Sequence, residues 1–239
     1  MDFKGQKVFI LGGSSGMGLE SAKNFSRGGA QVIIAARDEK KLERAAAEIG
    51  SGCRTVVLDM TDEECVKKTF ELIGAFDHLI LIGAGTPAWG PLPQITVQAL
   101  ECAFRTKLLG YFLCAKHAAS RISKNGSILF TIGGAARASI PGTAGLAAIN
   151  GGIAAMARTL ARELAPIRVN VLSPGLVDTP AYSWMGETER RAFFENMGGK
   201  LPAGRIGTVA DIALAVLSIT ANGFMTGATV DVDGGASLG

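Results

Sequence analysis

The sequence is poor in the residues that build disulfides and metal sites: 239 residues include four cysteines and two histidines. The cysteines are widely spaced, and none forms a Cys-x-x-Cys pair; they are Cys53, Cys65, Cys102 and Cys114. With only His78 and His117 beside them, no spacing typical of a metal site is present. The sequence therefore predicts reduced, apolar cysteines in a cytoplasmic protein that binds no structural metal.

Strong charge and long hydrophobic runs are also missing. The net charge is +3 and shows no basic stripe, which argues against a nucleic-acid partner. The first apolar run, Val8–Leu11, stops at Gly12 and is too short for a signal peptide. The mean hydropathy is +0.29, but the uncharged stretch 138–157 contains Pro141 and several glycines. It is better suited to a buried helix than to a membrane span, and no membrane partner is expected.

What the sequence does contain is a regular alternation of short apolar runs and helical patterns. The apolar runs predict strands at Lys7–Leu11, Gln31–Ala35, Arg54–Leu58, His78–Ile82, Ser127–Ile132, Arg168–Leu172 and Ala228–Val232. The helical patterns cover Gly16–Arg27, Glu39–Ile49, Asp62–Ile73 with Thr61 as N-cap, Val97–Ser120, Thr143–Leu164 and Val209–Thr220. This order predicts an α/β fold, a single Rossmann-type domain over 1–239 with about seven parallel strands and helices on both faces. Residues 180–201 break the rhythm and suggest a mobile helical lid.

A glycine-rich segment follows the first predicted strand and opens the first predicted helix. Its sequence is Gly12-Gly13-Ser14-Ser15-Gly16-Met17-Gly18. Glycine permits positive φ and close approach of a ligand, and a helix N-terminus offers free N–H groups to an anion. The segment therefore predicts a dinucleotide pyrophosphate site, with an ordinary turn as the alternative.

The end of the second predicted strand bears on the choice of cofactor. A carboxylate there would bind the ribose 2′-hydroxyl of NAD, but this chain has Ala36 followed by Arg37. A guanidinium pairs well with a 2′-phosphate, so NADP(H) is predicted in preference to NAD(H). The alternative is a surface arginine at a helix start. Asp59, after the third strand, is predicted to receive the adenine amine, with Met60 beside it, or to initiate the next helix.

Several further motifs occur in a characteristic order along the whole chain. They are Asp59 with Thr61-Asp62, Ala84-Gly85, Ala161–Leu164, Arg168–Asn170, Pro174–Thr179, Gly204–Gly207, and Thr226-Gly227 leading to Asp231–Gly235. Together with Gly12–Gly18, these motifs resemble the short-chain dehydrogenase/reductase family. The resemblance implies hydride transfer between NAD(P)(H) and a small carbonyl or alcohol substrate. It also implies cofactor contacts at Ala84, Gly85, Pro174, Gly175, Val177 and Thr179.

The chain departs from this family where the family carries out proton transfer. Counted back from Ala161–Leu164, the family's tyrosine falls on Leu146 and its lysine on Asn150. The serine position falls at Ile132-Gly133, the relay asparagine on Lys107, and the Asn pair before Ala84 is Ile82-Gly83. Lys107 and Asn150 are the remaining catalytic candidates. The alternatives are a lysine that reaches solvent or pairs with a carboxylate, and an amide satisfied within a helix interface. Tyr182, in the lid, is a further source of a phenol.

Two functions stay open on the sequence alone. The first is an NADP(H)-dependent oxidoreductase with a non-standard or impaired proton-transfer site, favoured by the cofactor loops and the apolar lid residues Trp184, Phe193 and Phe194. The second is a non-catalytic NADP(H)-binding sensor or partner subunit, favoured by Leu146 and Asn150. Small residues at three- and four-residue spacing in 143–164 predict close helix packing, and the resemblance implies a homodimer or homotetramer.

Overall fold

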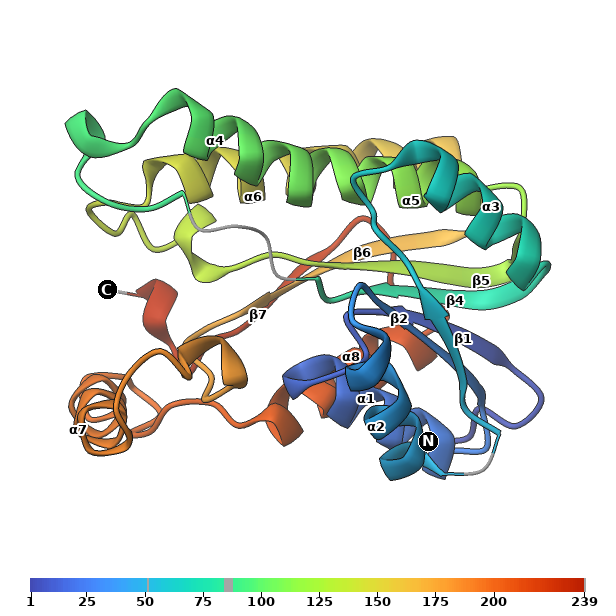
Figure 1. The fold of residues 1–239 in the computed structure, drawn as a ribbon, viewed down its shortest axis with the longest axis horizontal. Helices are drawn as coiled ribbons and strands as arrows, with labels where there is room; N and C mark the ends of the chain where they lie inside the picture. Colours follow the sequence, from blue (N-terminus) through green and yellow to red (C-terminus); the bar gives the residue numbers. More distant parts are fainter. Residues whose placement is uncertain (51, 84–87, 239) are drawn as a thin grey trace.

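Among the described residues, which are 1–50, 52–83 and 88–238 of a computed structural model, seven parallel strands form one sheet (Figure 1). The sheet order is β3-β2-β1-β4-β5-β6-β7, and every neighbouring pair is parallel. The strands are β1 (Lys7–Leu11), β2 (Gln31–Ala36), β3 (Arg54–Val57), β4 (Phe76–Leu81), β5 (Ile122–Thr131), β6 (Arg168–Pro174) and β7 (Thr229–Val232). The predicted α/β fold class is confirmed.

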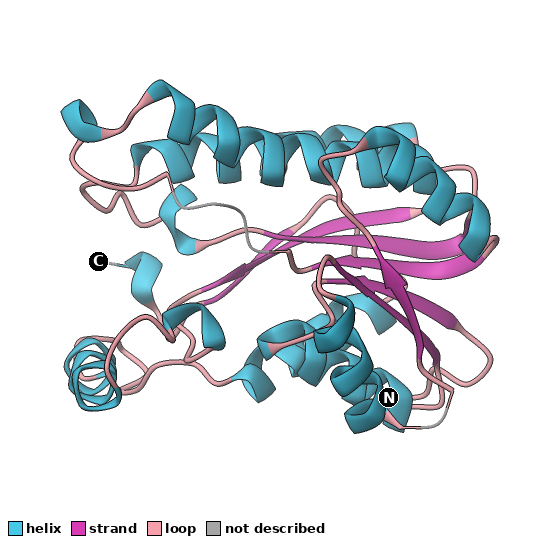
Figure 2. Ribbon diagram, in the orientation of Figure 1, coloured by secondary structure: helices cyan, strands magenta, loops and turns pink. Residues whose placement is uncertain are grey.

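Helices cover both faces of this sheet (Figures 1 and 2). They are α1 (Gly16–Arg27), α2 (Glu39–Ile49), α3 (Glu63–Ile73), α4 (Val97–Ala103), α5 (Gly110–Ala118), α6 (Ala144–Glu163), α7 (Glu187–Gly198) and α8 (Val209–Ala221). Helices α3, α4, α5 and α6 lie on one face, and α1, α2 and α8 lie on the other (Figure 1). Short 3₁₀ turns occur at η1 (Leu92–Gln94), η3 (Gly134–Ala136), η4 (Pro180–Tyr182) and η5 (Ala236–Leu238).

The central strands supply side chains to two separate apolar layers. In β1, Phe9 and Leu11 pack into the layer beneath α3, α5 and α6, whereas Val8 and Ile10 pack into the layer beneath α1, α2 and α8. Successive side chains of a strand point to opposite faces, so a strand covered on both sides is apolar throughout. This explains why the apolar runs in the sequence located the strands so closely.

The start of α3 differs from the prediction. Thr61 was expected as the N-cap, but this is wrong: Asp62 takes that position, and its Oδ1 accepts the N–H groups of Glu64 and Cys65. Thr61 instead donates both its N–H and its hydroxyl to Asp59 Oδ1. The two residues carry equally suitable cap side chains, and Thr61 is already engaged by the turn that follows β3.

The predicted helix over Val97–Ser120 is also wrong as a single regular helix. The structure has α4, then a π-helix, η2 (Phe104–Leu109), and then α5. A π turn has a wider hydrogen-bond spacing than an α turn, so the side chains after it face a new direction. Apolar periodicity does not reveal such a change over six residues.

The predicted lid segment 180–201 contains η4 and α7, so its helical character is confirmed. Tyr182 packs against Phe194 with ring centroids 5.2 Å apart, and Phe193 adjoins both. Trp184 lies outside this aromatic group and is exposed. The mobility of the segment stays a prediction.

Candidate functional site

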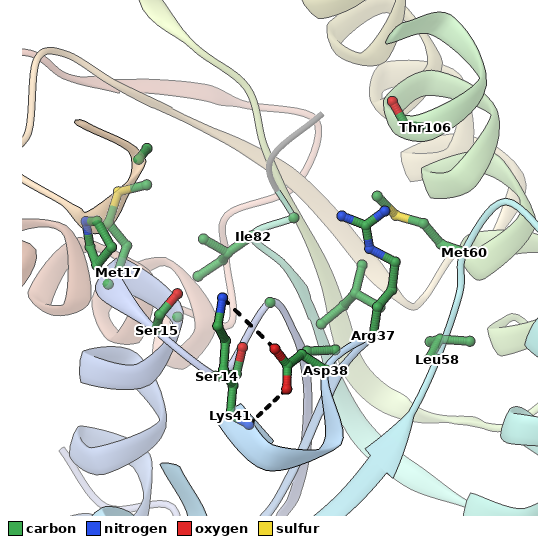
Figure 3. Close-up of a pocket in the computed structure, with 18 of the residues that line it drawn as sticks. Ser14, Ser15, Met17, Arg37, Asp38, Lys41, Leu58, Met60, Ile82 and Thr106 are labelled. Carbon is green, nitrogen blue, oxygen red and sulfur yellow. Dashed lines mark hydrogen bonds and ion pairs between the residues drawn. The ribbon is translucent and has the colours of Figure 1, made fainter. Parts of the chain in front are cut away.

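A cleft of about 490 Å³ opens at the carboxyl ends of β1, β2, β3 and β4. The sheet order places β1 between β2 and β4, which is where the chain changes direction across the sheet. Ligands of doubly wound sheets bind at such a point. The cleft is lined by Leu11, Gly12, Ser14–Gly18, Ala36–Asp38, Lys41, Leu58–Thr61, Ile82, Gly83, Thr106 and Thr179–Ala181 (Figure 3).

Two glycines of the loop after β1 are required by close contacts. Gly12 has a φ of +84°, and a Cβ atom there would lie 2.8 Å from the Ile82 carbonyl oxygen. A Cβ atom on Gly18 would lie 2.1 Å from the Gly12 carbonyl oxygen. Both substitutions would displace backbone, not a flexible side chain. The loop therefore turns tightly into α1 only with glycine at these positions.

The N-terminus of α1 is left without a protein cap at the cleft. Ser15 is extended, its hydroxyl makes no capping hydrogen bond, and the first turn of α1 has no acidic residue. By contrast, Asp38 caps α2 and Asp62 caps α3. The first N–H groups of a helix have no partner within the helix, and its dipole favours negative charge there. This end of α1 is suited to an anion from solution.

Positive charge gathers at the other side of the cleft, where β2 ends. Arg37 is exposed and lines the cleft. Its neighbour Asp38 is engaged by Lys41, through the backbone N–H at 3.0 Å and the ammonium at 3.9 Å (Figure 3). The Asp38 carboxylate thus caps α2 and forms an ion pair with Lys41. Arg37 and Lys41 together give this end of the cleft two cations.

Asp59 lines the cleft after β3. Its Oδ1 accepts the Thr61 N–H at 2.9 Å and the Thr61 hydroxyl at 2.8 Å. The N–H bond from Thr61, followed by its hydroxyl and by the charges of Arg37 and Arg105, holds the pKa of Asp59 below its usual value. The carboxylate is therefore ionised at neutral pH and can accept hydrogen bonds.

A second polar group lies where β5 ends. The Lys107 ammonium, from η2, donates to Asn150 Oδ1 at 3.1 Å, and Asn150 Nδ2 donates to the Gly133 carbonyl at 3.3 Å. Asn150 is buried in α6, and Leu146 lies one turn before it. Burial lowers the pKa of Lys107 to about 8. No ion pair joins Lys107 to a carboxylate within the described part of the chain.

The comparisons with known proteins agree over nearly the whole chain. Residues 12–237 match a family model described as enoyl-(acyl carrier protein) reductase. The short-chain dehydrogenase/reductase ATR9 of Stachybotrys chlorohalonatus is 30% identical, and the match covers 98% of each chain. The chain belongs to the short-chain dehydrogenase/reductase family.

Two further relatives bear on what this short-chain dehydrogenase/reductase does. The (2S)-[(R)-hydroxy(phenyl)methyl]succinyl-CoA dehydrogenase subunit BbsD of Thauera aromatica is 30% identical, covering 100% of this chain and 99% of the relative. A crystal structure of a small-chain dehydrogenase in complex with NADPH is 39% identical, with a TM-score of 0.83 and coverage of 98% of this chain and 99% of that one.

In this short-chain dehydrogenase/reductase, the cleft gathers most of the predicted cofactor residues. Gly12, Ser14, Ser15, Gly16, Met17, Gly18, Arg37, Asp59, Met60 and Thr179 all line it. Pro174, Gly175 and Val177 do not: Pro174 ends β6, Gly175 packs against Asp233, and Val177 is buried and pairs with Gly207. Ala84 and Gly85 lie outside the described residues. The sequence reasoning missed Lys41, and its place in the first turn of the predicted helix Glu39–Ile49, directly after Arg37 and Asp38, was the available signal.

The two tyrosines of the chain do not take the position that the family resemblance assigns to its tyrosine. Tyr111 is fully buried, and its hydroxyl lies against the carbonyl oxygens of Leu81, Gly83 and Thr131 at 3.0 to 3.3 Å. Burial raises its pKa far above the usual value. Tyr182 packs within the aromatic group of the lid, where burial also raises its pKa. The Tyr111 phenol is thus engaged within the core, and a role for the Tyr182 phenol stays a prediction.

The described residues contain no group of three or more His, Cys, Asp and Glu side chains that could hold a metal ion. Among the helices formed by those residues, none is long and apolar enough to cross a membrane.

Proposed function

We propose that this short-chain dehydrogenase/reductase binds NADP(H) and transfers hydride between this cofactor and a small carbonyl or alcohol substrate. One observation carries the proposal: the uncapped N-terminus of α1 and the Arg37 guanidinium lie in the same cleft. This cleft is at the point between β1 and β4 where the order of the strands reverses. A dinucleotide with a 2′-phosphate carries negative charge at both of these places. The related structure with bound NADPH supports the same choice.

Each part of the cofactor has matching residues in the cleft. The N–H groups of Ser14–Gly18 would hold the pyrophosphate, as at other glycine-rich helix starts. Arg37, assisted by Lys41, would pair with the 2′-phosphate, and Asp59 would accept the adenine amine, with Met60 against the ring. The family resemblance assigns the nicotinamide half to Pro174, Gly175, Val177 and Thr179, and further contacts to Ala84 and Gly85. When bound, the nicotinamide supplies or accepts the hydride.

The substrate in this proposal is small and partly apolar. The lid segment lines the cleft with Pro180 and Ala181 and carries the aromatic group of Tyr182, Phe193 and Phe194. The protein would act as a homo-oligomer. Cytoplasmic residence is part of the same proposal, since all four cysteines are free in the structure.

A second function has its own supporting observation. Leu146 and the pair Ile132-Gly133 carry no side-chain group that can donate a proton, and they stand where the family resemblance places a tyrosine and a serine. A protein that binds NADP(H) without turnover, as a sensor or as partner subunit of an active relative, would need neither. The Thauera aromatica relative is named as a dehydrogenase subunit.

Turnover separates the two functions. NADPH oxidation is followed by absorbance with a panel of aldehydes, ketones and quinones. The proposed oxidoreductase gives substrate-dependent oxidation that Ser15→Asp abolishes, because the new carboxylate would cap α1 and repel the pyrophosphate. Ser15→Asn, which caps without charge, is the matched control. Tight NADPH binding without turnover on the whole panel would instead establish the second function.

A further inference from the structure

Lys107 and Asn150 form a connected pair from two helices. The ammonium donates to Asn150 Oδ1 at 3.1 Å, while the amide nitrogen of Asn150 donates to the Gly133 carbonyl at 3.3 Å. The second bond fixes the direction of the amide, since a flipped amide would set its nitrogen against the ammonium and its oxygen against the carbonyl. Asn150 is only 3% exposed, so its oxygen is held toward Lys107 with little competition from water.

The ammonium has no carboxylate to neutralise it within the described residues. The charged groups on the elements around it are engaged elsewhere or placed on outer surfaces. Glu101 and Arg105 line an outer groove, Lys116 and His117 pair with Glu63, Arg137 pairs with Asp231, and Arg158, Arg162 and Glu163 line the surface of the far half of α6. The thiol of Cys114 and the phenol of Tyr111 are buried and neutral. No neighbouring carboxylate among the described residues therefore stabilises the charged form of Lys107 against the effect of burial.

The pair lies next to Thr106, a residue of the cleft lining, and is not itself part of that lining. Thr106, which precedes Lys107, lines the cleft together with Ile82 and Gly83 at the end of β4. Gly133 follows the end of β5, the next strand of the sheet. A dinucleotide with its phosphate end at β2 and its pyrophosphate at α1 extends toward these two strand ends. The π-helix η2 lies here as well, and π turns are frequent at functional sites.

We propose that Lys107 is the catalytic proton donor of this protein and that Asn150 positions it. The inference rests on the proposed oxidoreductase function. In reduction, the hydride forms a C–H bond at the carbonyl carbon, and the electron pair of the C=O π bond moves to oxygen. The Lys107 N–H bond breaks as its proton moves to that oxygen, giving the alcohol. The neutral amine then regains a proton from water, and NADPH has been oxidised to NADP⁺.

The acidity of Lys107 suits this task. Burial lowers its pKa to about 8, from the ordinary value of 10.5 for a lysine. A general acid works best when its pKa is near the operating pH, so that it is protonated and still gives up the proton readily. Carbonyl reduction needs the protonated form, so its rate is constant at lower pH and falls as the pH rises through about 8.

The test compares Lys107→Met, Lys107→Arg and Lys68→Met on the full-length protein. Lys68 is an exposed lysine of α3 and serves as the matched control. NADPH affinity is measured by calorimetry, and turnover by NADPH oxidation with the best carbonyl of the panel. Lys107→Met should lose about 10²- to 10⁴-fold in kcat while NADPH affinity changes less than about threefold. Lys107→Arg should also lose activity, because a guanidinium stays protonated in proteins and is a poor acid. Lys68→Met should behave as the wild type.

Asn150→Asp gives a readout that a purely structural role would not change. It keeps the shape of the side chain and sets a carboxylate against the ammonium, which raises the pKa of Lys107. The fall in rate at high pH should therefore move upward by at least about one pH unit. Folding of every variant is checked by its thermal midpoint.

The possible outcomes separate the role of Lys107 from the proposed oxidoreductase function. An active wild type whose kcat survives in Lys107→Met overturns the assignment of Lys107 alone. The assignment of Lys107 is also overturned if Lys107→Met lowers NADPH affinity as much as it lowers activity. It is overturned as well if the pH at which the rate falls is the same in Asn150→Asp as in the wild type. A wild type that binds NADPH and reduces nothing overturns the proposed function, and the role of Lys107 with it.

Discussion

Arg37 is the residue on which the choice of cofactor depends. It lies exposed at the end of β2, and its neighbour Asp38 is engaged by the α2 cap and by Lys41. Among the described residues, no ion pair engages the guanidinium, so it is available to a phosphate. A 2′-hydroxyl carries no charge and would gain little from it.

Replacing Arg37 therefore tests cofactor choice directly. Arg37→Ala should weaken NADPH binding by about 10- to 100-fold, which is the effect of losing hydrogen bonds to a charged group worth about 1.5–3 kcal/mol. NADH affinity should change less than about threefold. Calorimetric titration of both cofactors measures the two effects. Arg44→Ala, an exposed arginine of α2 outside the cleft lining, is the control.

A loss shared equally by NADPH and NADH would show that Arg37 supports the fold of the cleft and does not select the phosphate. An unchanged NADPH affinity would remove the arginine from the cofactor site.

Individual residues differ in how far the sequence could place them. Gly12 and Arg37 were predictable because they adjoin strand ends, and strand ends are local features. The contact between Lys107 and Asn150 joins residues 43 positions apart on two helices. The sequence left Lys107 among the catalytic candidates, but it held no signal that Asn150 is its acceptor. That contact depends on how α6 and η2 pack.

At the scale of elements, the outer face of α4, η2, α5 and α6 is apolar and open. A groove on it is lined by Phe104, Leu108, Leu109, Phe112 and Met156 among others. Phe112 is 47% exposed, and α6 presents small exposed residues at Ala148, Gly151 and Ala155. Small residues at this spacing let a second helix approach closely. We propose that two copies of the chain meet at this face.

The expected oligomer can be measured by size-exclusion chromatography with light scattering. The wild type should have at least twice the chain mass of 24.7 kDa. Phe112→Glu should shift the protein toward the monomer, because a carboxylate would be buried in an apolar interface. Leu72→Glu, on the exposed side of α3, should leave the mass unchanged. A monomeric wild type at micromolar concentration would contradict the oligomer.

Element boundaries show why local signals succeed or fail. Helix α1 was predicted at its observed bounds, because the glycine loop and the strand before it mark its start. The π turn between α4 and α5 was missed, since residues on both sides of it remain helical and apolar. Thr61 and Asp62 were confused for a similar reason: both are suitable caps, and only the bonds to Asp59 separate them.

At the scale of the whole molecule, the fold was predictable because the alternation of buried strands and amphipathic helices permits few arrangements. The sheet order then gathers distant segments at one edge, and the cleft there is lined by the last residues of β1 and β2 and by residues that follow β3 and β4. The shape of the cleft was not predictable to the same extent. It depends on Thr179 and on Pro180 and Ala181 at the start of the lid, whose positions no pattern in the sequence specifies.

The central claim is that this cleft binds NADP(H), and a calorimetric titration of the wild type with NADPH and NADH tests it most directly. Ser15→Asp and Ser15→Asn are titrated in parallel, because only the former adds charge at the N-terminus of α1. The account predicts that NADPH binds at least about tenfold more tightly than NADH, and that Ser15→Asp loses both cofactors while Ser15→Asn keeps them. Absence of binding by either cofactor, or tighter binding of NADH, would contradict it.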